Sequence, residues 1–281
     1  MNLVVLGEDS FTSIVLESLI RSEYNILGVY CPFYENNIHA RLESTCNKYS
    51  ISFERVNDIN SDEFLKTISL FQIDLIVICH FQKLISSKII HLPKNGCINL
   101  HPSLLPNYRG MSPQHFPIIR GESETGISIH FVDEGIDTGD IIIQKKIIIN
   151  DDDYVSDLQN KMKIIYSTIV VDAIEKIKSG SNDFIIQKHL TGSYFGKLKF
   201  SDCIINKNFT CEQAYNLIRA VSFPYFGAHY NNLIIWKAIK VSNLHIDTNI
   251  ELGEIFYNEN GTFLKLVDGY LKLLKFEINE K

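Results

Sequence analysis

The chain has 281 residues, of which 45% are hydrophobic and 21% are charged, and this balance is typical of a globular protein. Its 17 Phe and 13 Tyr residues, with abundant aliphatic side chains, exclude an intrinsically disordered chain. No stretch approaches the ~20 uninterrupted apolar residues that a membrane-spanning helix needs. The formal net charge of −6 disfavours a nucleic-acid binder, because binding to phosphates requires a basic face.

The amino terminus and the cysteines together indicate a cytoplasmic location. Residues 1–8 lack the basic segment and long apolar core of a secretory signal peptide. The six cysteines form no C-x-x-C pair and have no histidines at metal-ligand spacing. We therefore expect reduced thiols and no bound metal.

Strand-like and helix-like segments alternate through the first half of the chain. An apolar run at 3–6 ends at Gly7, and a periodic apolar segment follows, for which Ser10 and Thr12 are candidate N-caps. Further strands are expected at 25–30, 75–79 and 97–100, with a helix at 39–49. The run at 75–79 is wholly apolar, as in a buried central strand. The pattern predicts an α/β fold.

The second half begins with expected strands at 127–132 and 141–149, followed by a helix after the acidic run at 151–153. We interpret this run as a favourable helix N-terminus rather than a metal loop. Beyond residue ~190 the pattern changes to one helix at 211–221 and short strands at 228–230, 233–241, 253–257, 263–267 and 270–278. These strands indicate a second domain built as a small β-barrel or curled sheet.

Polar side chains that can carry chemistry concentrate between Asn99 and Asp140. Asn99 and His101 are two residues apart at a strand end, so they share a face at the sheet edge where α/β proteins bind ligands. An amide beside an imidazole can stabilise an oxyanion and move a proton, and a carboxylate from the 135–140 loop can orient the imidazole. A lone histidine at a strand end is more often structural. The residues alone therefore indicate only an α/β enzyme with a candidate Asn/His/Asp site.

The segment NLHPSLLPNYRG at 99–110, followed by DEGIDTGD at 133–140, resembles the 10-formyltetrahydrofolate-dependent formyltransferases. Tail segments at 217–228 and 236–238 are similar to the C-terminal domain of methionyl-tRNA formyltransferase and of formyltransferases that act on nucleotide-linked amino sugars. The resemblance implies a Rossmann-like catalytic domain over 1–195 with a mostly parallel, twisted sheet. It also implies a small, β-rich, OB-like C-terminal domain over 200–281.

The resemblance implies that Asn99, His101 and Asp137 are the catalytic triad. In this family, the acceptor amine attacks the formyl carbon, the first two residues hold the oxyanion, and the aspartate sets the histidine's protonation state and relays the amine's proton. The implied folate slot lies between residues 80–85 and 132–136, where HFQKLIS at 80–86 replaces the small-residue-Tyr-Gly form of the tRNA enzyme. The implied cofactor-binding residues are Phe81, Leu84, Ile85, Asp133 and Ile136, and the substrate-binding candidates are Arg109, Met111 and Ser112.

Three acceptors compete within this family. Glycinamide ribonucleotide transformylase is shorter and has a Gly/Ser-rich phosphate loop after its first strand, where this chain has Glu8 and Asp9, so we disfavour it. Methionyl-tRNA formyltransferase must hold RNA, yet residues 201–281 carry eight basic against nine acidic residues, a balance of −1. A nucleotide-linked amino sugar carries only a diphosphate, for which Arg109 would suffice.

We therefore expect an N-formyltransferase that acts on a dTDP- or UDP-linked 3-amino or 4-amino deoxysugar for a surface glycan such as lipopolysaccharide O-antigen. Methionyl-tRNA or another amine, such as an aminoacyl group on a carrier, remains the alternative. A non-catalytic binding module is disfavoured because all three triad positions are intact. Apolar strands in the tail, with the resemblance, suggest a homodimer. The sequence does not choose the sugar, its ring position or its nucleotide.

Overall fold

The computed structural model describes residues 1–34, 39–187, 191–241 and 250–279. The chain forms two compact units. The first unit comprises residues 1–110, 126–147 and 161–194, and the second comprises 111–125, 148–160 and 195–281. The chain thus passes into the second unit and back twice before its last segment. Among helices of the described ranges, none is long and apolar enough to cross a membrane.

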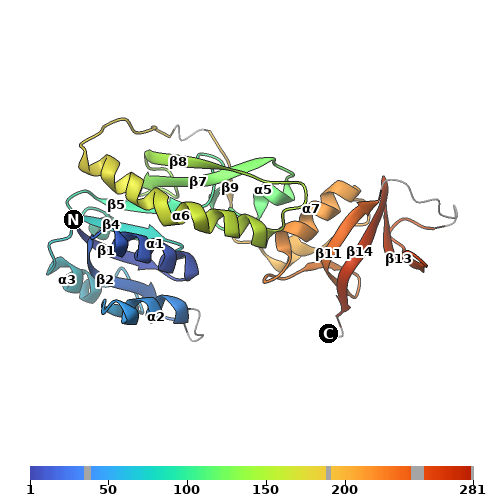
Figure 1. Ribbon diagram of the computed structural model, residues 1–281, viewed down its shortest axis with the longest axis horizontal. Helices are drawn as coiled ribbons and strands as arrows, with labels where there is room; N and C mark the ends of the chain where they lie inside the picture. Colours follow the sequence, from blue (N-terminus) through green and yellow to red (C-terminus); the bar gives the residue numbers. More distant parts are fainter. Residues whose placement is uncertain (35–38, 188–190, 242–249, 280–281) are drawn as a thin grey trace. The chain divides into compact units, whose positions relative to one another are not determined.

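The first unit is built on a seven-stranded sheet with the order β3-β2-β1-β4-β5-β7-β8 (Figure 1). Strands β1 to β5 pair in parallel, and β7 pairs antiparallel with β5. This order confirms the mostly parallel, Rossmann-like sheet. The strands are β1 Asn2–Gly7, β2 Asn25–Pro32, β3 Phe53–Val56, β4 Leu75–Cys79, β5 Cys97–His101, β7 Glu124–Phe131 and β8 Ile141–Ile148.

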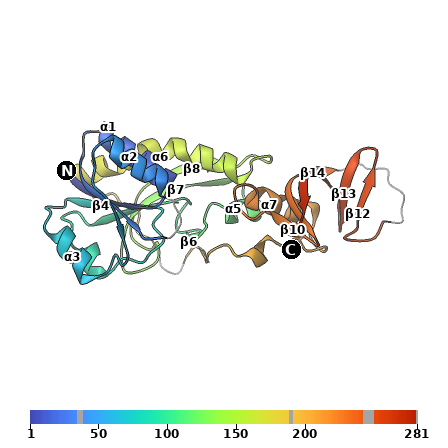
Figure 2. The same cartoon turned by 90° about the horizontal axis from the view of Figure 1, so that it is seen from below.

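Helices cover both faces of this sheet. Helices α1, α2 and α6 lie along one face and α3 lies along the other (Figure 2). The Ser18 hydroxyl of α1 donates to the carbonyl oxygen of Ser167 in α6 at 2.6 Å, which ties two of these helices together. The helices are α1 Ser10–Arg21, α2 Ala40–Lys48, α3 Asp62–Ser69, α4 Ser87–Ile90 and α6 Val155–Lys178.

The core of the first unit explains the position of its central strands. Every residue of β4 is buried, and all of β1 after Asn2 is buried as well, as their continuous apolar runs require.

The predicted N-cap of α1 is wrong: Asp9, rather than Ser10 or Thr12, caps the helix, and its carboxylate accepts from the backbone amides of Phe11 and Thr12. Thr12 is engaged elsewhere, because its hydroxyl donates to the carbonyl oxygen of Cys79 at 2.9 Å.

The second unit contains a five-stranded antiparallel sheet with the order β10-β11-β14-β13-β12. This confirms the β-rich C-terminal region. Helix α7, Cys211–Val221, opens with a capping box between Thr210 and Gln213 and packs on β11. The short helix α5, Phe116–Ile119, packs on α7. The strands are β10 Ala228–Tyr230, β11 Leu233–Val241, β12 Ile255–Asn258, β13 Gly261–Leu266 and β14 Gly269–Ile278.

Three minor elements complete the described chain. Strands β6, Arg109–Gly110, and β9, Tyr194–Phe195, pair as a small separate sheet. A short 3-10 helix, η1, spans Phe200–Cys203. All six cysteines are buried and none forms a disulfide.

Candidate functional site

Asn99 and His101 lie at the carboxyl end of β5, as the sequence predicts. His101 is the last residue of the strand and is 4% exposed, whereas Asn99 is partly buried. The antiparallel register of β5 and β7 places Asn99 opposite His130. These side chains therefore meet where a parallel sheet gives way to an antiparallel strand.

Asp137 joins these two residues from the loop between β7 and β8. Its backbone has a φ of 53°, a left-handed conformation that is uncommon for a residue with a side chain. Its Oδ1 accepts from Asn99 Nδ2 at 3.3 Å, and its Oδ2 lies 3.5 Å from His101 Nδ1. The amide of Gly110 donates to the same Oδ2 at 2.8 Å. The structure thus brings together the three residues of the expected triad.

A second histidine, His130, belongs to this cluster and was missed in the sequence. Its Nε2 lies 3.4 Å from Asp137 Oδ1 and 3.3 Å from Asn99 Nδ2. Its Nδ1 faces the carbonyl oxygen of Phe131 at 2.7 Å, so Nδ1 carries a hydrogen. The sequence places His130 on an expected strand with alternating apolar and polar residues. It does not show that this strand, β7, pairs with β5 and so brings His130 next to Asn99.

Burial and hydrogen bonding set the charges in this cluster. Burial alone would raise the pKa of Asp137, but His101, His130 and the Gly110 amide hold that pKa well below its usual range. Burial lowers the pKa of His101, and the Asp137 carboxylate opposes that shift without cancelling it. His101 Nε2 faces the carbonyl oxygen of Tyr108 at 2.8 Å and so carries a hydrogen. Its Nδ1, which faces Asp137, is the atom that takes up a proton.

Two buried side chains, Gln187 and Arg109, support the loop that contains Asp137. Gln187 is 4% exposed, and its Nε2 donates to the carbonyl oxygens of Asp137 at 3.0 Å and Gly139 at 2.7 Å. Arg109, which is 8% exposed, donates from Nη2 to Gln187 Oε1 at 3.0 Å. Arg109 therefore has a structural partner in the first unit, and its contact with a diphosphate stays a prediction. No sequence motif drew attention to Gln187, which lies 50 residues after Asp137.

The expected cofactor residues divide into two groups. Phe81 and Ile85 are partly buried and pack against the core that contains β1 and β4. Leu84 and Ile136 are 75% and 43% exposed. Asp133 lies in the loop that carries Asp137, where its Oδ1 accepts from the Thr138 hydroxyl at 2.7 Å and the Gly135 amide at 3.1 Å. Their contacts with folate stay predictions.

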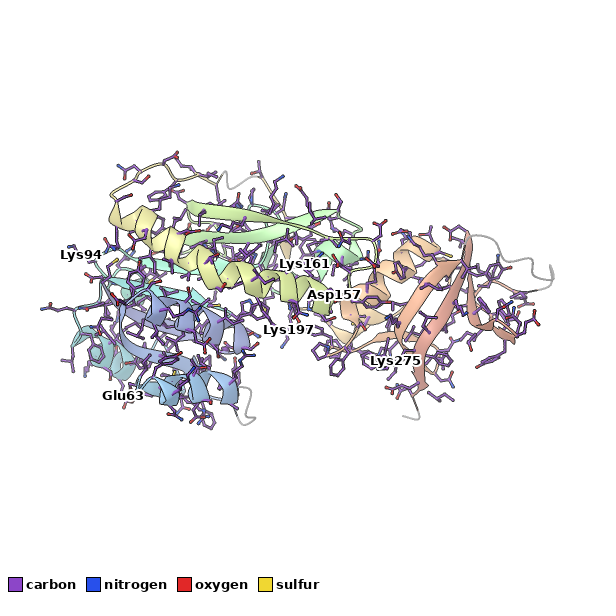
Figure 3. The ribbon with its side chains drawn as sticks, in the orientation of Figure 1. Glu63, Lys94, Asp157, Lys161, Lys197 and Lys275 are labelled. Atoms are coloured by element: carbon purple, nitrogen blue, oxygen red, sulfur yellow. The ribbon has the colours of Figure 1, made fainter. Side chains whose placement is uncertain are left out.

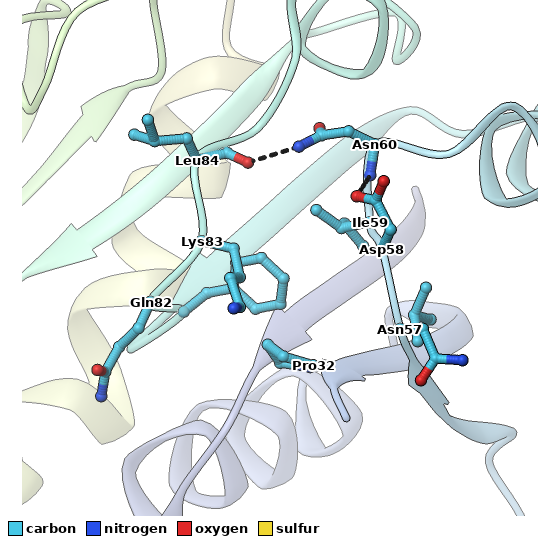
Figure 4. A pocket seen from close by; sticks show the side chains of 10 residues that line it. Pro32, Asn57, Asp58, Ile59, Asn60, Gln82, Lys83 and Leu84 are labelled. Carbon is cyan, nitrogen blue, oxygen red and sulfur yellow. Dashed lines mark hydrogen bonds between the residues drawn. The ribbon is translucent and has the colours of Figure 1, made fainter. Parts of the chain in front are cut away.

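A cavity of about 320 Å³ opens beside the segment after β4 (Figure 4). Phe81, Ile59 and Leu84 supply apolar surface, while Lys83 supplies a cation. The remaining lining residues are Pro32, Val56, Asn57, Asp58, Asn60 and Gln82. The described residues contain no cluster of His, Cys, Asp and Glu arranged to hold a metal.

Met111 and Ser112, two of the substrate-binding candidates, belong to the second unit. The amide of Met111 donates to the carbonyl oxygen of Phe195 at 2.8 Å, and the Ser112 hydroxyl accepts from the amide of Leu198 at 3.1 Å. These contacts fix the segment that follows Gly110 within its own unit. A role in substrate binding stays a prediction for both residues.

Comparison with known proteins gives two sets of relatives. Residues 1–174 match the family model described as formyl transferase. A methionyl-tRNA formyltransferase of Halothermothrix orenii is 30% identical over 99% of this chain and 92% of its own length. One of Carboxydothermus hydrogenoformans is 33% identical over 77% of this chain and 71% of its own length.

The solved structures resemble this chain in fold. The sugar 3N-formyl transferase WlaRD, crystallised with dTDP and 5-N-formyl-tetrahydrofolate, has a TM-score of 0.73 at 23% identity and covers 96% of both chains. An N-formyltransferase of Helicobacter canadensis in complex with folinic acid and dTDP-3-aminofucose has a TM-score of 0.74 at 21% identity. It covers 98% of this chain and 99% of its own.

Proposed function

We propose that this protein, which belongs to the formyl transferase family, transfers a formyl group to the amino group of a nucleotide-linked amino sugar. Formyl transfer is the chemistry of the family, and its formyl donor is 10-formyltetrahydrofolate. The choice of acceptor depends on residues of this chain outside the triad.

The geometry of Asn99, His101 and Asp137 supports a direct transfer without a covalent enzyme intermediate. As the amine nitrogen bonds to the formyl carbon, His101 takes up the proton that the amine loses, at Nδ1, and Asp137, 3.5 Å away, stabilises the resulting imidazolium. The bond from the formyl carbon to N10 of the folate then breaks, and His101 returns the proton to N10, so that tetrahydrofolate leaves. Asn99 donates from its side-chain amide to the oxyanion that forms on the formyl oxygen. In this structure the Asn99 amide lies within 3.3 Å of Asp137 and of His130, so one of these contacts gives way when the substrates bind.

The donor fits the first unit. The apolar side chains of Phe81 and Leu84 with the ammonium of Lys83 suit a folate, which joins flat rings to a glutamate carboxylate. When bound, 10-formyltetrahydrofolate supplies the activated formyl group. Residues of the chain then orient that group and exclude water.

The observation that carries the sugar acceptor is the charge of the C-terminal region. Residues 201–281 have eight basic and nine acidic residues, and Lys275 of β14 is one of the exposed cations among them (Figure 3). Binding a tRNA depends on several contacts between cations and phosphates, whereas a nucleotide sugar presents one diphosphate. A near-neutral surface therefore favours the smaller acceptor.

A second candidate acceptor, methionyl-tRNA, is favoured by the sequence relatives. The chain covers 92% of a methionyl-tRNA formyltransferase at 30% identity, whereas the two solved structures named above are 23% and 21% identical.

A mass-spectrometric assay separates these acceptors. The full-length protein is incubated with 10-formyltetrahydrofolate and, separately, with dTDP- and UDP-linked 3-amino and 4-amino sugars and with methionyl-tRNA. We expect one formyl group to be added to a nucleotide sugar and none when His101→Ala is used. Formylation of methionyl-tRNA alone would overturn the sugar acceptor and leave formyl transfer standing.

A further inference from the structure

Two acidic residues that the proposed chemistry does not use, Glu8 and Asp9, follow directly after β1. Strands β1 and β4 are parallel neighbours whose register pairs Gly7 with Cys79. The residues that follow the two strands, Glu8 and His80, are therefore brought to the same edge of the sheet. His80 has a φ of 51° and opens the segment that contains the expected folate contacts.

Asp9 joins this segment to helix α1. Its Oδ2 lies 2.8 Å from His80 Nδ1, while its Oδ1 accepts from the amides of Phe11 and Thr12 at 2.9 and 3.3 Å. The ring of His80 stacks on Phe11 with 4.5 Å between centroids. Its Nε2 lies 3.2 Å from the hydroxyl of Tyr166 in α6. Every polar atom of the His80 ring thus has a partner.

Glu8 holds the next part of the same segment. Its side chain is buried, with 2% of the residue exposed. Its Oε1 accepts from the backbone amide of Gln82 at 2.5 Å, and its Oε2 lies 3.4 Å from the Tyr34 hydroxyl. The two carboxylates therefore fix the turn from His80 to Gln82 at both ends, and Phe81 is the residue between them.

The same contacts place a carboxylate of the chain itself at the N-terminus of α1. The N-terminus of α1 carries partial positive charge and free amides that would attract an anion. Asp9 already occupies that position with its own carboxylate. Burial alone would lower the pKa of His80, and the Asp9 carboxylate raises it above its ordinary value, which favours the ionised pair.

We propose that Glu8 and Asp9 are positioning residues that hold the His80–Gln82 turn, and with it Phe81, in the conformation that binds the folate. This inference rests on the proposed formyl donor. It gives His80 a role as the partner of Asp9, and it gives Glu8 a role as the acceptor of the backbone amide of Gln82.

The test is equilibrium binding of 5-formyltetrahydrofolate without any acceptor, together with steady-state kinetics. Asp9→Asn keeps a capping oxygen but removes the charge, and His80→Asn removes the imidazole while tolerating the positive φ. We expect each variant to raise the folate Kd about tenfold, and the KM for 10-formyltetrahydrofolate equally, with kcat nearly unchanged. The double variant should bind no worse than either single variant.

Glu43→Gln is the matched control, because Glu43 forms an exposed ion pair with Arg55 at 2.7 Å in the same unit. It should bind folate as the wild type does. Wild-type affinity in both Asp9→Asn and His80→Asn would overturn the inference, as would additive losses in the double variant. His80→Asn keeps the test valid if Asp9→Asn unfolds α1. A wild-type protein that does not bind folate would overturn the proposed donor as well.

Discussion

At the scale of single residues, the account depends on one carboxylate and the groups that surround it. Asp137 accepts hydrogen bonds from Asn99 and from the Gly110 amide, and it faces both His101 and His130. A carboxylate with this many partners stays ionised throughout the pH range in which enzymes work. It can therefore stabilise a proton on His101 without taking that proton itself.

The first prediction concerns the oxyanion donor. Asn99→Ala should lower kcat by about 100-fold to 1000-fold, because removing one such donor costs roughly 2.7–4 kcal/mol of transition-state stabilisation. Steady-state kinetics with saturating folate measures this loss. Asn47→Ala, at an exposed position of α2, is the control and should retain wild-type turnover. An Asn99→Ala variant that turns over at the control's rate would remove Asn99 from the mechanism.

The second prediction concerns the pH dependence of the rate. In the proposed mechanism His101 acts as a base, and burial places its pKa below the ordinary value of 6.5. The neutral form is therefore present at pH 7, and kcat/KM should fall only as the pH drops below 6.5. Rates measured between about pH 5 and 8 resolve this limb. A fall in rate centred above pH 6.5 would mean that burial does not lower the pKa of His101.

At the scale of elements, the loop between β7 and β8 that carries Asp137 is held by a buried side chain from the segment after α6. The third prediction tests the loop that carries Asp137. Gln187→Met removes the donor to the carbonyl oxygens of Asp137 and Gly139. We expect kcat to fall about tenfold and the free energy of unfolding to fall by about 1–3 kcal/mol. Gln72→Met, at an exposed position, should change neither quantity.

The outcome for Gln187→Met is read from kinetics and urea unfolding on the same preparations. A loss of stability with unchanged kcat would show that Gln187 supports the fold without positioning Asp137. Unchanged stability and unchanged kcat would show that the two carbonyl oxygens find other donors.

The fourth prediction concerns the contact between α5 and α7 in the second unit. His115 is 3% exposed, its Nδ1 donates to the carbonyl oxygen of Ala220 at 2.7 Å, and burial lowers its pKa to about 4. The unfolded chain therefore binds a proton at this residue more readily, so stability falls as the pH drops from 6.5 towards 4. This residue alone should account for a loss of about 3 kcal/mol.

The comparison that checks this is the pH dependence of urea unfolding for wild type and for His115→Gln. The variant has lower stability at pH 7, but its curve should be flatter below pH 6.5 because the titrating group is gone. Parallel curves for the two proteins would contradict the assignment to His115.

The sequence predicts those elements whose pattern is local. The wholly apolar strand at 75–79 and the tail strands between turn residues were expected and are present as β4 and β10 to β14. Strand β3 was not expected, because its four residues are only partly buried or exposed and show no apolar run. The N-cap of α1 was misassigned because Asp9, Ser10 and Thr12 are all suitable residue types, and only the bonds of Asp9 to the Phe11 and Thr12 amides distinguish it.

In the candidate site, too, local patterns could be predicted from the sequence and long-range contacts could not. Asn99 and His101 share a strand and could be paired from spacing alone, whereas the family motif was needed to add Asp137. His130, Gln187 and the Asp9–His80 pair depend on contacts between segments at least 31 residues apart. A single sequence carries no signal for such contacts, since it does not show which strands are neighbours.

At the scale of the whole molecule, the two sets of relatives are named for different acceptors of the formyl group. Sequence relatives are methionyl-tRNA formyltransferases, and structural neighbours are sugar N-formyltransferases. The proposed catalytic residues suit either acceptor, because each presents a primary amine. The choice therefore depends on the charge of the remaining surface, and residues 201–281 have a balance of −1.

The measurement that tests the central claim most directly is a competition in one reaction. A dTDP-linked amino sugar, methionyl-tRNA and limiting 10-formyltetrahydrofolate are mixed with the wild-type protein, and both products are quantified by mass spectrometry. The account predicts that the formyl group appears on the nucleotide sugar and that His101→Ala forms neither product. Formyl groups found predominantly on methionyl-tRNA would contradict it.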